Sequence, residues 1–289
     1  MTVPPGPAAS GQAPHVRLVY TDLDGTMVGP HGCFFRAEGG GLTLDPARAL
    51  VALHEAGIAL VLVSGRTRLQ LQEAARVFGA DGFVGEMGAV LGWDGGRAWE
   101  LLEGAMPAGV AAGHATPYDA LTATGVVDAL LARHDGRRPG LGRLEPHAPW
   151  HLGHEADVML RGRVEVADVE AWLAAEGYGW LRLRDNGALP PVGDAVPRHV
   201  YHLMADGLTK GLGVAHDLAR RGLSAAQAVA VGDSLSDLEM AAHVGRMWVT
   251  ANGARVPAVA ARAAEVGAVV TADAVGLGWA EAVRHAAGR

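Results

Sequence analysis

The sequence predicts an α/β protein in which a mostly parallel β-sheet is covered by helices and interrupted by an inserted α+β module. Two continuous apolar runs, residues 58–63 and 228–232, are typical of strands buried on both faces of a parallel sheet. Helical spacing follows each run, as in βαβ units. Between about residues 93 and 204 the pattern changes to proline-punctuated segments, some with alternating apolar positions, which favour antiparallel strands.

The first part of the chain alternates expected strands and helices. Strands are expected at residues 16–20, 58–63 and 82–85, and helices at 46–56 and 68–78. Asp45-Pro46 predicts the start of the first helix, with Asp45 as its N-cap, and Gly57 predicts its end. Strands at this spacing predict right-handed crossovers. In such sheets ligands bind at the carboxyl ends of the strands.

The inserted module is expected to mix helices with antiparallel strands. Helices are expected at residues 126–133 and 166–176, and strands at 157–161, 180–184 and 199–203. Asn186-Gly187 predicts a two-residue hairpin turn, after which Ala188-Leu189 would begin the return strand.

The parallel pattern resumes after residue 204. A helix is expected to begin at Lys210 and stop at Gly222, and further strands at 228–232 and 247–249, with helices ending near 244, 264 and 287. The predicted domains are a Rossmann-like core, residues 15–92 and 205–289, and an α+β domain, residues 93–204. Residues 1–14, rich in proline, glycine and alanine, are expected to form a disordered tail.

Composition limits the classes of function and the compartment. The 289 residues carry a formal net charge of −7, which disfavours a general nucleic-acid-binding protein. Cys33 is the single cysteine, so an intrachain disulfide is impossible and a reducing compartment is expected. The sequence shows neither a signal peptide nor an apolar run long enough to cross a membrane. We therefore expect a cytoplasmic protein with no membrane or nucleic-acid partner.

Polar residues of complementary chemistry lie at the ends of the predicted strands. Asp22 and Asp24 follow the first strand, where they could serve as a nucleophile and an acid/base, although an ordinary acidic turn would have the same composition. Ser64 follows the second strand and is accompanied by the backbone amide of Gly65. Lys210 begins a helix, where a positive charge and free amides both favour an anion.

Two further carboxylates, Asp233 and Asp237, follow the strand at residues 228–232. Carboxylates gathered at one site repel each other unless a cation neutralises them, and a set of oxygen ligands suits Mg²⁺. A hydroxyl, a lysine and Mg²⁺ together can stabilise the negative charge of a phosphoryl group. The residues alone therefore indicate a site for phosphoryl chemistry.

These residues, in this order, resemble the motifs of the haloacid dehalogenase superfamily, specifically its phosphatase branch. Asp22 to Thr26 match the DxDGT motif, Ser64 the second motif, Lys210 the third, and Gly232 to Asp237 the GDxxxD motif. The inserted module lies where class IIB members carry a large cap. Within that class the sequence is most similar to the Cof-type phosphatases and to mannosyl-3-phosphoglycerate and sucrose-phosphate phosphatases.

The resemblance implies a role for each motif residue. Asp22 would attack phosphorus and form a phosphoaspartate, while Asp24 would protonate the leaving oxygen and then activate water. Mg²⁺ would be held by Asp22, the backbone carbonyl of Asp24, and Asp233. Asp237 would bind the metal or its water, or orient Lys210. Phosphate oxygens would be bound by Ser64, Gly65 and Lys210.

Two positions depart from the class IIB pattern, in ways that affect substrate identity more than chemistry. Met87 stands where an asparagine is usual, and Ser236 stands where another asparagine is usual. Three further residues could contact substrate or support the site: Arg66, Asn252 and Arg184. Glu86 is expected to be a solvated loop residue.

A histidine cluster in the inserted module gives a weaker signal. His147, His151 and His154 have a spacing that could hold zinc, but Pro146 and Pro149 interrupt any helix there and no cysteine joins them. A surface loop is therefore the favoured interpretation.

The resemblance predicts an Mg²⁺-dependent phosphomonoesterase that acts on a small phosphorylated metabolite, preferably a sugar phosphate or a glycosyl-3-phosphoglycerate. A phosphomutase would use the same core residues, and a non-catalytic sensor or interaction protein could share the fold. A monomer or a small homo-oligomer is expected.

Overall fold

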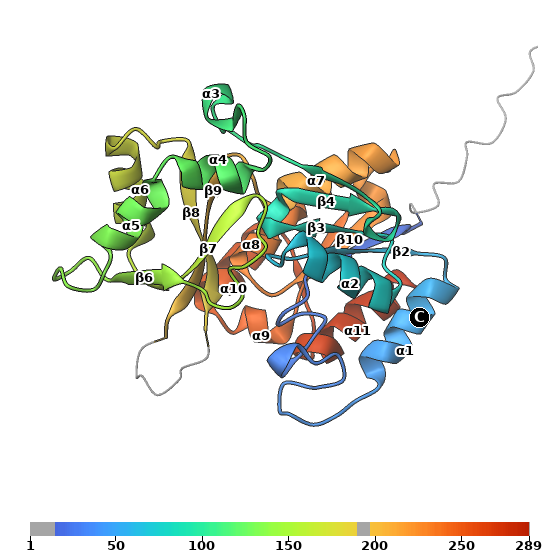
Figure 1. The fold of residues 1–289 in the computed structure, drawn as a ribbon. Coiled ribbons are helices and arrows are strands. Elements are labelled where there is room, and N and C mark those ends of the chain that lie inside the picture. Colours follow the sequence, from blue (N-terminus) through green and yellow to red (C-terminus); the bar gives the residue numbers. More distant parts are fainter. Residues whose placement is uncertain (1–14, 190–196, 289) are drawn as a thin grey trace, which may run out of the picture.

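The computed structural model describes residues 15–189 and 197–288, so the predicted disordered tail at residues 1–14 lies outside the described residues. The described chain forms two β-sheets in neighbouring lobes (Figure 1). The larger sheet has the strand order β12-β11-β10-β1-β2-β3-β4-β5, and the smaller has the order β6-β7-β9-β8. The α/β prediction, with a parallel-dominated sheet and an inserted α+β module, is confirmed.

The larger sheet is parallel from β12 to β3 and antiparallel at β4 and β5. Apolar side chains bury its central strands on both faces, as the continuous apolar runs predict. Its strands are β1 Leu18–Thr21, β2 Ala59–Val63, β3 Gly82–Gly85, β4 Val90–Trp93, β5 Ala98–Leu101, β10 Ala228–Gly232, β11 Arg246–Val249 and β12 Val269–Val270.

Helices cover both faces of this sheet (Figure 1). They are α1 Asp45–Glu55, α2 Arg68–Phe78, α7 Lys210–Arg221, α8 Leu235–Leu238, α9 Ala251–Ala254, α10 Pro257–Glu265 and α11 Val275–Ala286. Short 3-10 turns lie between them: η1 Pro30–Gly32, η2 Glu86–Gly88, η3 Asp94–Gly96, η4 Ala225–Gln227 and η5 Glu239–His243.

Capping side chains fix where two of the functional helices begin. Thr67 and Gln70 form a capping box at the start of α2, and the hydroxyl of Thr209 accepts a hydrogen bond from the backbone of Leu212 at the start of α7. The prediction that Asp45 is an N-cap is wrong, because Asp45 is the first residue of α1 and its own amide donates to the hydroxyl of Thr43.

The smaller sheet is antiparallel throughout. Its strands are β6 Arg143–Pro146, β7 Asp157–Arg163, β8 Leu181–Ala188 and β9 His199–Ala205, and the accompanying helices are α3 Ala108–Ala111, α4 Pro117–Ala123, α5 Val126–Arg133 and α6 Val166–Ala175. Leu183 on β8 and Leu203 on β9 lie opposite each other and are buried. We refer to this lobe as the cap and to the lobe of the larger sheet as the core.

Two sequence-based boundaries need correction. Asn186-Gly187 does not form a hairpin turn, because β8 continues through it to Ala188 with a register shift after Asp185. The larger sheet also continues through β5 to Leu101, so the predicted domain boundary at residue 93 falls before the end of that sheet. The chain re-enters the core after β9, close to the predicted boundary at residue 204.

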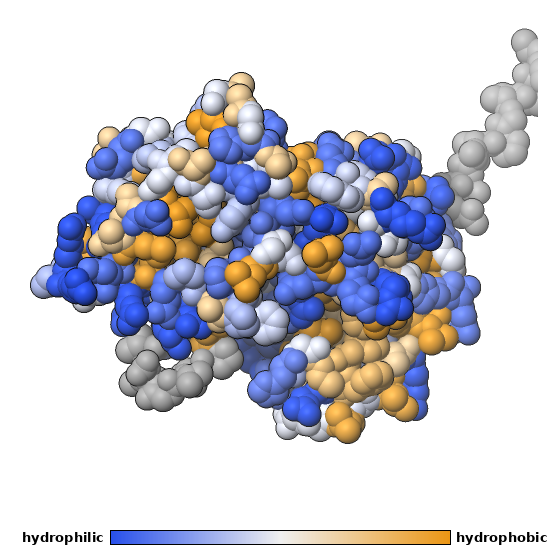
Figure 2. All heavy atoms as spheres, in the orientation of Figure 1, coloured by the Kyte–Doolittle hydropathy of each residue, from blue (hydrophilic) through white to orange (hydrophobic). Residues whose placement is uncertain are grey.

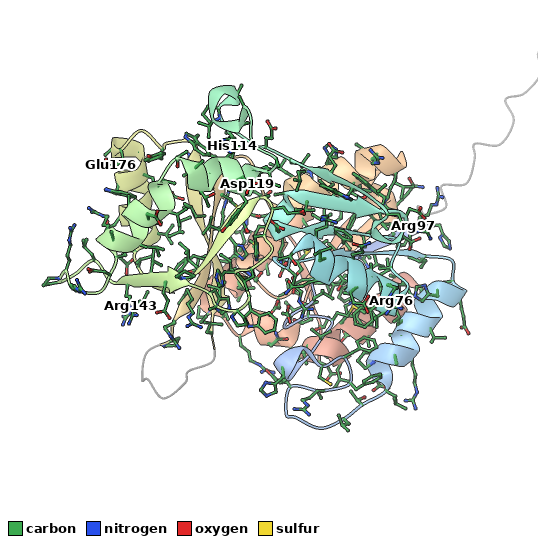
Figure 3. All side chains as sticks on the ribbon, viewed as in Figure 1. Arg76, Arg97, His114, Asp119, Arg143 and Glu176 are labelled. Atoms are coloured by element: carbon green, nitrogen blue, oxygen red, sulfur yellow. The ribbon has the colours of Figure 1, made fainter. Side chains whose placement is uncertain are left out.

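Hydrophilic side chains cover most of the face seen in Figure 2, and apolar side chains are scattered among them. Six charged or polar side chains on the outer surface of the two lobes are labelled in Figure 3, and all are exposed: Arg76, Arg97, His114, Asp119, Arg143 and Glu176. None of the described helices is long and apolar enough to cross a membrane.

Candidate active site

The predicted site residues meet at one edge of the larger sheet. Strands β10, β1 and β2 are neighbours and run parallel, so the loops that follow them open on the same side. These loops carry Asp233, Asp22 and Ser64 respectively, and Lys210 enters from the start of α7. The sequence alone places these residues as much as 211 positions apart, counted from Asp22 to Asp233 (233 − 22). Their proximity follows from the strand order.

Lys210 lies at the centre of the site and is almost completely buried. Its Nζ donates to Oδ1 of Asp22 at 2.8 Å and to Oδ1 of Asp237 at 2.6 Å. Burial lowers the pKa of Lys210, but the two carboxylates outweigh that effect and raise its pKa. The amine is therefore held as a cation.

Asp237 is fully buried, and hydrogen bonds engage both of its oxygens. Its Oδ2 accepts from the backbone amides of Asp233 at 3.0 Å and Ser234 at 2.9 Å, and from the Ser234 hydroxyl at 2.7 Å. This carboxylate therefore orients Lys210 and shapes the loop that follows β10.

Asp233 is held from two further segments of the chain. Its Oδ1 accepts from the hydroxyl of Thr26, and its Oδ2 accepts from Nδ2 of Asn252, both at 3.1 Å. Asn252 also donates to the carbonyl of Gly25 at 2.8 Å. Gly25 has φ +88°, and a Cβ there would collide with the Asp233 carboxylate, so glycine is required for this close approach.

Three carboxylates, those of Asp22, Asp233 and Asp237, have oxygen atoms within 4.8 Å of one another. Burial raises the pKa of Asp22 to about 7, Asp237 adds to the rise, and Lys210 opposes it. Burial also raises the pKa of Asp233, and Asp22 adds to that rise. One lysine does not neutralise three carboxylates, so the donor set and its charge fit a hard divalent cation such as Mg²⁺.

Asp24 is more exposed than the other motif carboxylates and is paired with Arg66. The guanidinium donates from Nε to Oδ2 at 2.8 Å and from Nη2 to Oδ1 at 2.6 Å. Ser64 is buried, and its hydroxyl accepts from the backbone amide of Arg66 at 3.3 Å. The Ser64–Arg66 loop therefore links the expected phosphate-binding hydroxyl to the expected acid/base.

A cavity of about 250 Å³ lies between the cap and the core, beside this site. Its core side includes Met87 and Ser236, the two positions that depart from the class IIB pattern, together with Thr209, which precedes Lys210. Its cap side includes Arg184. Nη1 of Arg184 lies 3.6 Å from a carboxylate oxygen of Glu239, and its buried Nε has no hydrogen-bond partner among the described residues.

A second group of ionisable residues lies buried where the cap meets the core. It consists of Glu86 from η2, His154 from the loop before β7, Asp157 from β7 and His202 from β9, and we call it the junction cluster. Nδ1 of His154 and Nδ1 of His202 contact different oxygens of Asp157. The expectations that Glu86 is solvated and that His154 belongs to a surface loop are both wrong.

The members of the junction cluster shift one another's pKa values. Burial lowers the pKa of His154, but Asp157 and Glu86 outweigh that effect and raise its pKa to about 9. Burial raises the pKa of Asp157, but His154 and His202 outweigh that effect and lower it. Burial and the charge of Asp157 raise the pKa of Glu86 to about 8.

The ligand atoms of His154, Asp157 and His202 also lie close enough to hold a metal ion. Hydrogen bonds nevertheless satisfy this group, since neither imidazole nor either carboxylate of the junction cluster is among the unpartnered buried atoms of the described chain. His147 and His151 do not join the group, so the zinc spacing in the sequence does not correspond to a three-histidine site.

Comparison with known proteins agrees with this architecture. Residues 195–277 match the family model described as haloacid dehalogenase-like hydrolase. A comparison with curated proteins finds no match.

Solved structures extend the similarity to nearly the whole chain. The sucrose-phosphatase from Synechocystis sp. PCC6803, in complex with sucrose and phosphate, is 14% identical, with a TM-score of 0.61 over 94% of this chain and 98% of that chain. A haloacid dehalogenase-like hydrolase from Bacteroides thetaiotaomicron is 17% identical, with a TM-score of 0.61 over 93% and 99%. A subclass IIB sugar phosphatase is 16% identical, with a TM-score of 0.59 over 93% and 98%. The shared fold and the family match confirm the resemblance that the motifs predicted.

Proposed function

We propose that this chain, with the fold of the haloacid dehalogenase-like hydrolases, is an Mg²⁺-dependent phosphomonoesterase for a small phosphorylated metabolite. The observation that carries the proposal is the meeting of Asp22, Asp233, Asp237 and Lys210 at the strand ends, beside a cavity between the cap and the core. A sugar phosphate or a glycosyl-3-phosphoglycerate is the preferred substrate class, supported by the sugar phosphatases among the structural neighbours.

In the proposed reaction, an oxygen of Asp22 attacks phosphorus and the bond from phosphorus to the leaving oxygen breaks. Asp24 gives its proton to that oxygen, and the alcohol leaves. Asp24 then accepts a proton from water as the water oxygen attacks the phosphoaspartate. Inorganic phosphate is released and the Asp22 carboxylate is restored.

The surrounding residues supply charge and position for this reaction. Lys210, Ser64 and the backbone amide of Gly65 would bind the phosphoryl oxygens, where negative charge concentrates in the transition state. Asp22, Asp233 and the backbone carbonyl of Asp24 would hold Mg²⁺, which would supply further positive charge for those oxygens. Arg66 orients Asp24 through its two hydrogen bonds. Asp237 positions Lys210.

We further propose a division of labour between the lobes. The core, residues 15–92 and 205–289 with the extension through β5, would carry the chemistry, and the cap would set specificity. The leaving group would occupy the cavity between them, in contact with Arg184 and Ser236. Closing the cap would exclude bulk water from the reaction. A cytoplasmic location, consistent with the single cysteine, is part of the proposal.

The test is phosphate release from a panel of phosphorylated sugars, phosphoglycerate derivatives and other small phosphoesters, with Mg²⁺ and after its removal by chelation. We expect release that depends on Mg²⁺ and is lost in Asp22→Asn. Isomerisation of a hexose phosphate without phosphate release would instead indicate a phosphomutase. No reaction with any panel member, in wild type and variant alike, would contradict the proposal of an enzyme.

A further inference from the structure

The face of the cap sheet that meets the core is polar at the positions nearest the active site. His202 on β9 lies opposite Arg184 on β8 and Met159 on β7, and Asp157 is two residues from Met159 on the same strand. Because side chains alternate along a strand, all four point to one face of the sheet. Leu183 and Leu203 belong to the opposite face.

His202 and Asn186 lie directly over Gly65 of the core. A Cβ added to Gly65 would be 3.0 Å from Nε2 of His202 and 3.1 Å from Nδ2 of Asn186. Asp157 holds the other ring nitrogen of His202, so the ring cannot rotate away without losing that hydrogen bond. The irregular register after Asp185 places the Asn186 amide 3.5 Å from the same Nε2. The cap therefore rests on the residue between Ser64 and Arg66.

The same loop is held from the core by η2. The amide of Glu86 donates to the carbonyl of Arg66 at 3.1 Å, and the amide of Met87 donates to the carbonyl of Ser64 at 3.4 Å. The Glu86 carboxylate in turn accepts from two cap amides, those of Glu155 at 2.9 Å and Ala156 at 2.7 Å. Glu86 therefore connects the Ser64–Arg66 loop to the cap backbone.

We propose that His202 and Glu86 are positioning residues that hold the Ser64–Arg66 loop in its reactive position only while the cap is docked. His202 acts by contact with Gly65, and Glu86 acts by joining η2 to the start of β7. Asp157 keeps His202 in its orientation. The phosphate-binding role of Ser64 in this inference rests on the proposed function, whereas the mechanical coupling of cap and loop does not.

The coupling can be tested by adding one methyl group and then making room for it. Gly65→Ala places a Cβ against His202, and Gly65 has no left-handed φ that would strain alanine. His202→Asn is shorter, removes the two His202 atoms nearest that Cβ, and keeps an amide donor for Asp157. Asn186, whose Nδ2 is 3.1 Å from the same Cβ, then loses the Nε2 partner beside it. Gly41→Ala is the matched control, because a Cβ there meets nothing within 4 Å.

Two measurements are made on wild type, both single variants, the double variant and the Gly41→Ala control, which should match wild type: kcat/KM for phosphate release, and amide hydrogen exchange in residues 64–67. We expect Gly65→Ala to lower kcat/KM on the order of 10- to 100-fold, the cost of a small misplacement of reacting groups, and to speed exchange in the loop. The double variant should recover most of both losses relative to Gly65→Ala, because the two positions are in contact. Thermal unfolding of each variant shows whether it is folded.

Two results would overturn the inference. Gly65→Ala could have the kcat/KM and the amide exchange of wild type, or the loss of kcat/KM in the double variant could equal the product of the losses in the two single variants. If the wild-type chain released no phosphate, the proposed function would fail. The exchange measurement would still decide whether the cap holds the loop.

Discussion

Asp22 is a buried carboxylate that hydrogen-bonds Lys210 and lies within a few ångströms of two other acidic groups. Such a group can attack phosphorus only if its surroundings hold it in place and neutralise the charge around it. Lys210 contributes one charge, and the proposed cation contributes the rest. Replacing the Asp22 side chain alone therefore tests whether it is the nucleophile.

The first prediction concerns Asp22→Asn, which keeps the shape of the side chain and removes its nucleophilic charge. We expect kcat to fall by at least about 10³-fold, since removal of a catalytic nucleophile disables the whole catalytic unit. Steady-state phosphate release measures the loss. Asp45→Asn, which changes an exposed carboxylate paired with Arg48, should leave kcat unchanged. Similar rates for both variants would exclude Asp22 as the nucleophile.

The second prediction concerns the pair formed by Arg66 and Asp24. In Arg66→Ala the acid loses its orientation, so hydrolysis of alkyl phosphates should slow by roughly 10- to 100-fold, within the range of general acid catalysis. A nitrophenyl phosphate, whose leaving group needs no proton, should be affected much less. Arg66→Lys keeps the charge but not the two-pronged contact and should rescue only part of the loss. Equal losses on both substrates would contradict this role for Arg66.

The sequence motifs predict six residues of the site, because each follows a buried strand or begins a helix: Asp22, Asp24, Ser64, Lys210, Asp233 and Asp237. The junction cluster has no such signal. Glu86, His154, Asp157 and His202 belong to four separate segments, and only the docking of cap on core brings them together. The local hints are the spacing of His147, His151 and His154, which includes one member of the cluster, and a histidine among the apolar residues of β9.

At the scale of elements, the buried parallel strands, the capped helices and the cap strands β7, β8 and β9 were predictable, whereas the four-residue antiparallel strands β4, β5 and β6 were not. β4 contains Gly92, which weakens the strand pattern, yet a Cβ at that position would collide with the ring of Phe83 on β3. Asn186-Gly187 is a strong local turn signal, but cross-strand pairing with β9 overrides it. In both cases tertiary contacts decide the outcome.

The third prediction concerns the pH dependence of the stability that the junction cluster gives where the cap meets the core. The folded pKa of His154 is raised from 6.5 to about 9, so its stabilising contribution is complete below pH 6.5 and is lost as pH rises through about 9. His154→Gln should lower Tm by roughly 5–10 °C near pH 6, as expected when one partner of a buried ion pair is removed. The difference in Tm from wild type should shrink above pH 9. A difference in Tm between His154→Gln and wild type that does not change with pH would contradict the prediction that His154 stabilises the fold as a cation.

At the scale of the whole molecule, the cap and the core together form the cavity that no single lobe provides. Arg68 on α2 donates to the carboxylate of Glu155 in the cap at 2.6 and 2.9 Å, and Glu86 binds the neighbouring cap amides. These contacts fasten the cap beside the active site. Substrate selection should therefore depend on residues from both lobes.

The fourth prediction concerns Arg184, whose guanidinium is only loosely paired within the cavity. Arg184→Ala should raise KM for the preferred substrate by roughly 10- to 100-fold, the loss of a charged hydrogen bond, and change kcat little. Arg182→Ala is the control, because Arg182 on the same strand is already held by Asp206 at 2.7 Å. A rise in KM for Arg182→Ala alone would place substrate elsewhere on the cap.

The central claim is that the chain transfers a phosphoryl group to Asp22. The most direct measurement is mass spectrometry of the protein quenched in acid during turnover of a nitrophenyl phosphate, whose leaving group needs no proton from Asp24, with Asp24→Asn to slow hydrolysis of the intermediate. We predict a gain of one phosphoryl group on the peptide that contains Asp22, and its absence in Asp22→Asn. A quenched enzyme that releases phosphate but never carries a phosphoryl group on that peptide would contradict the account.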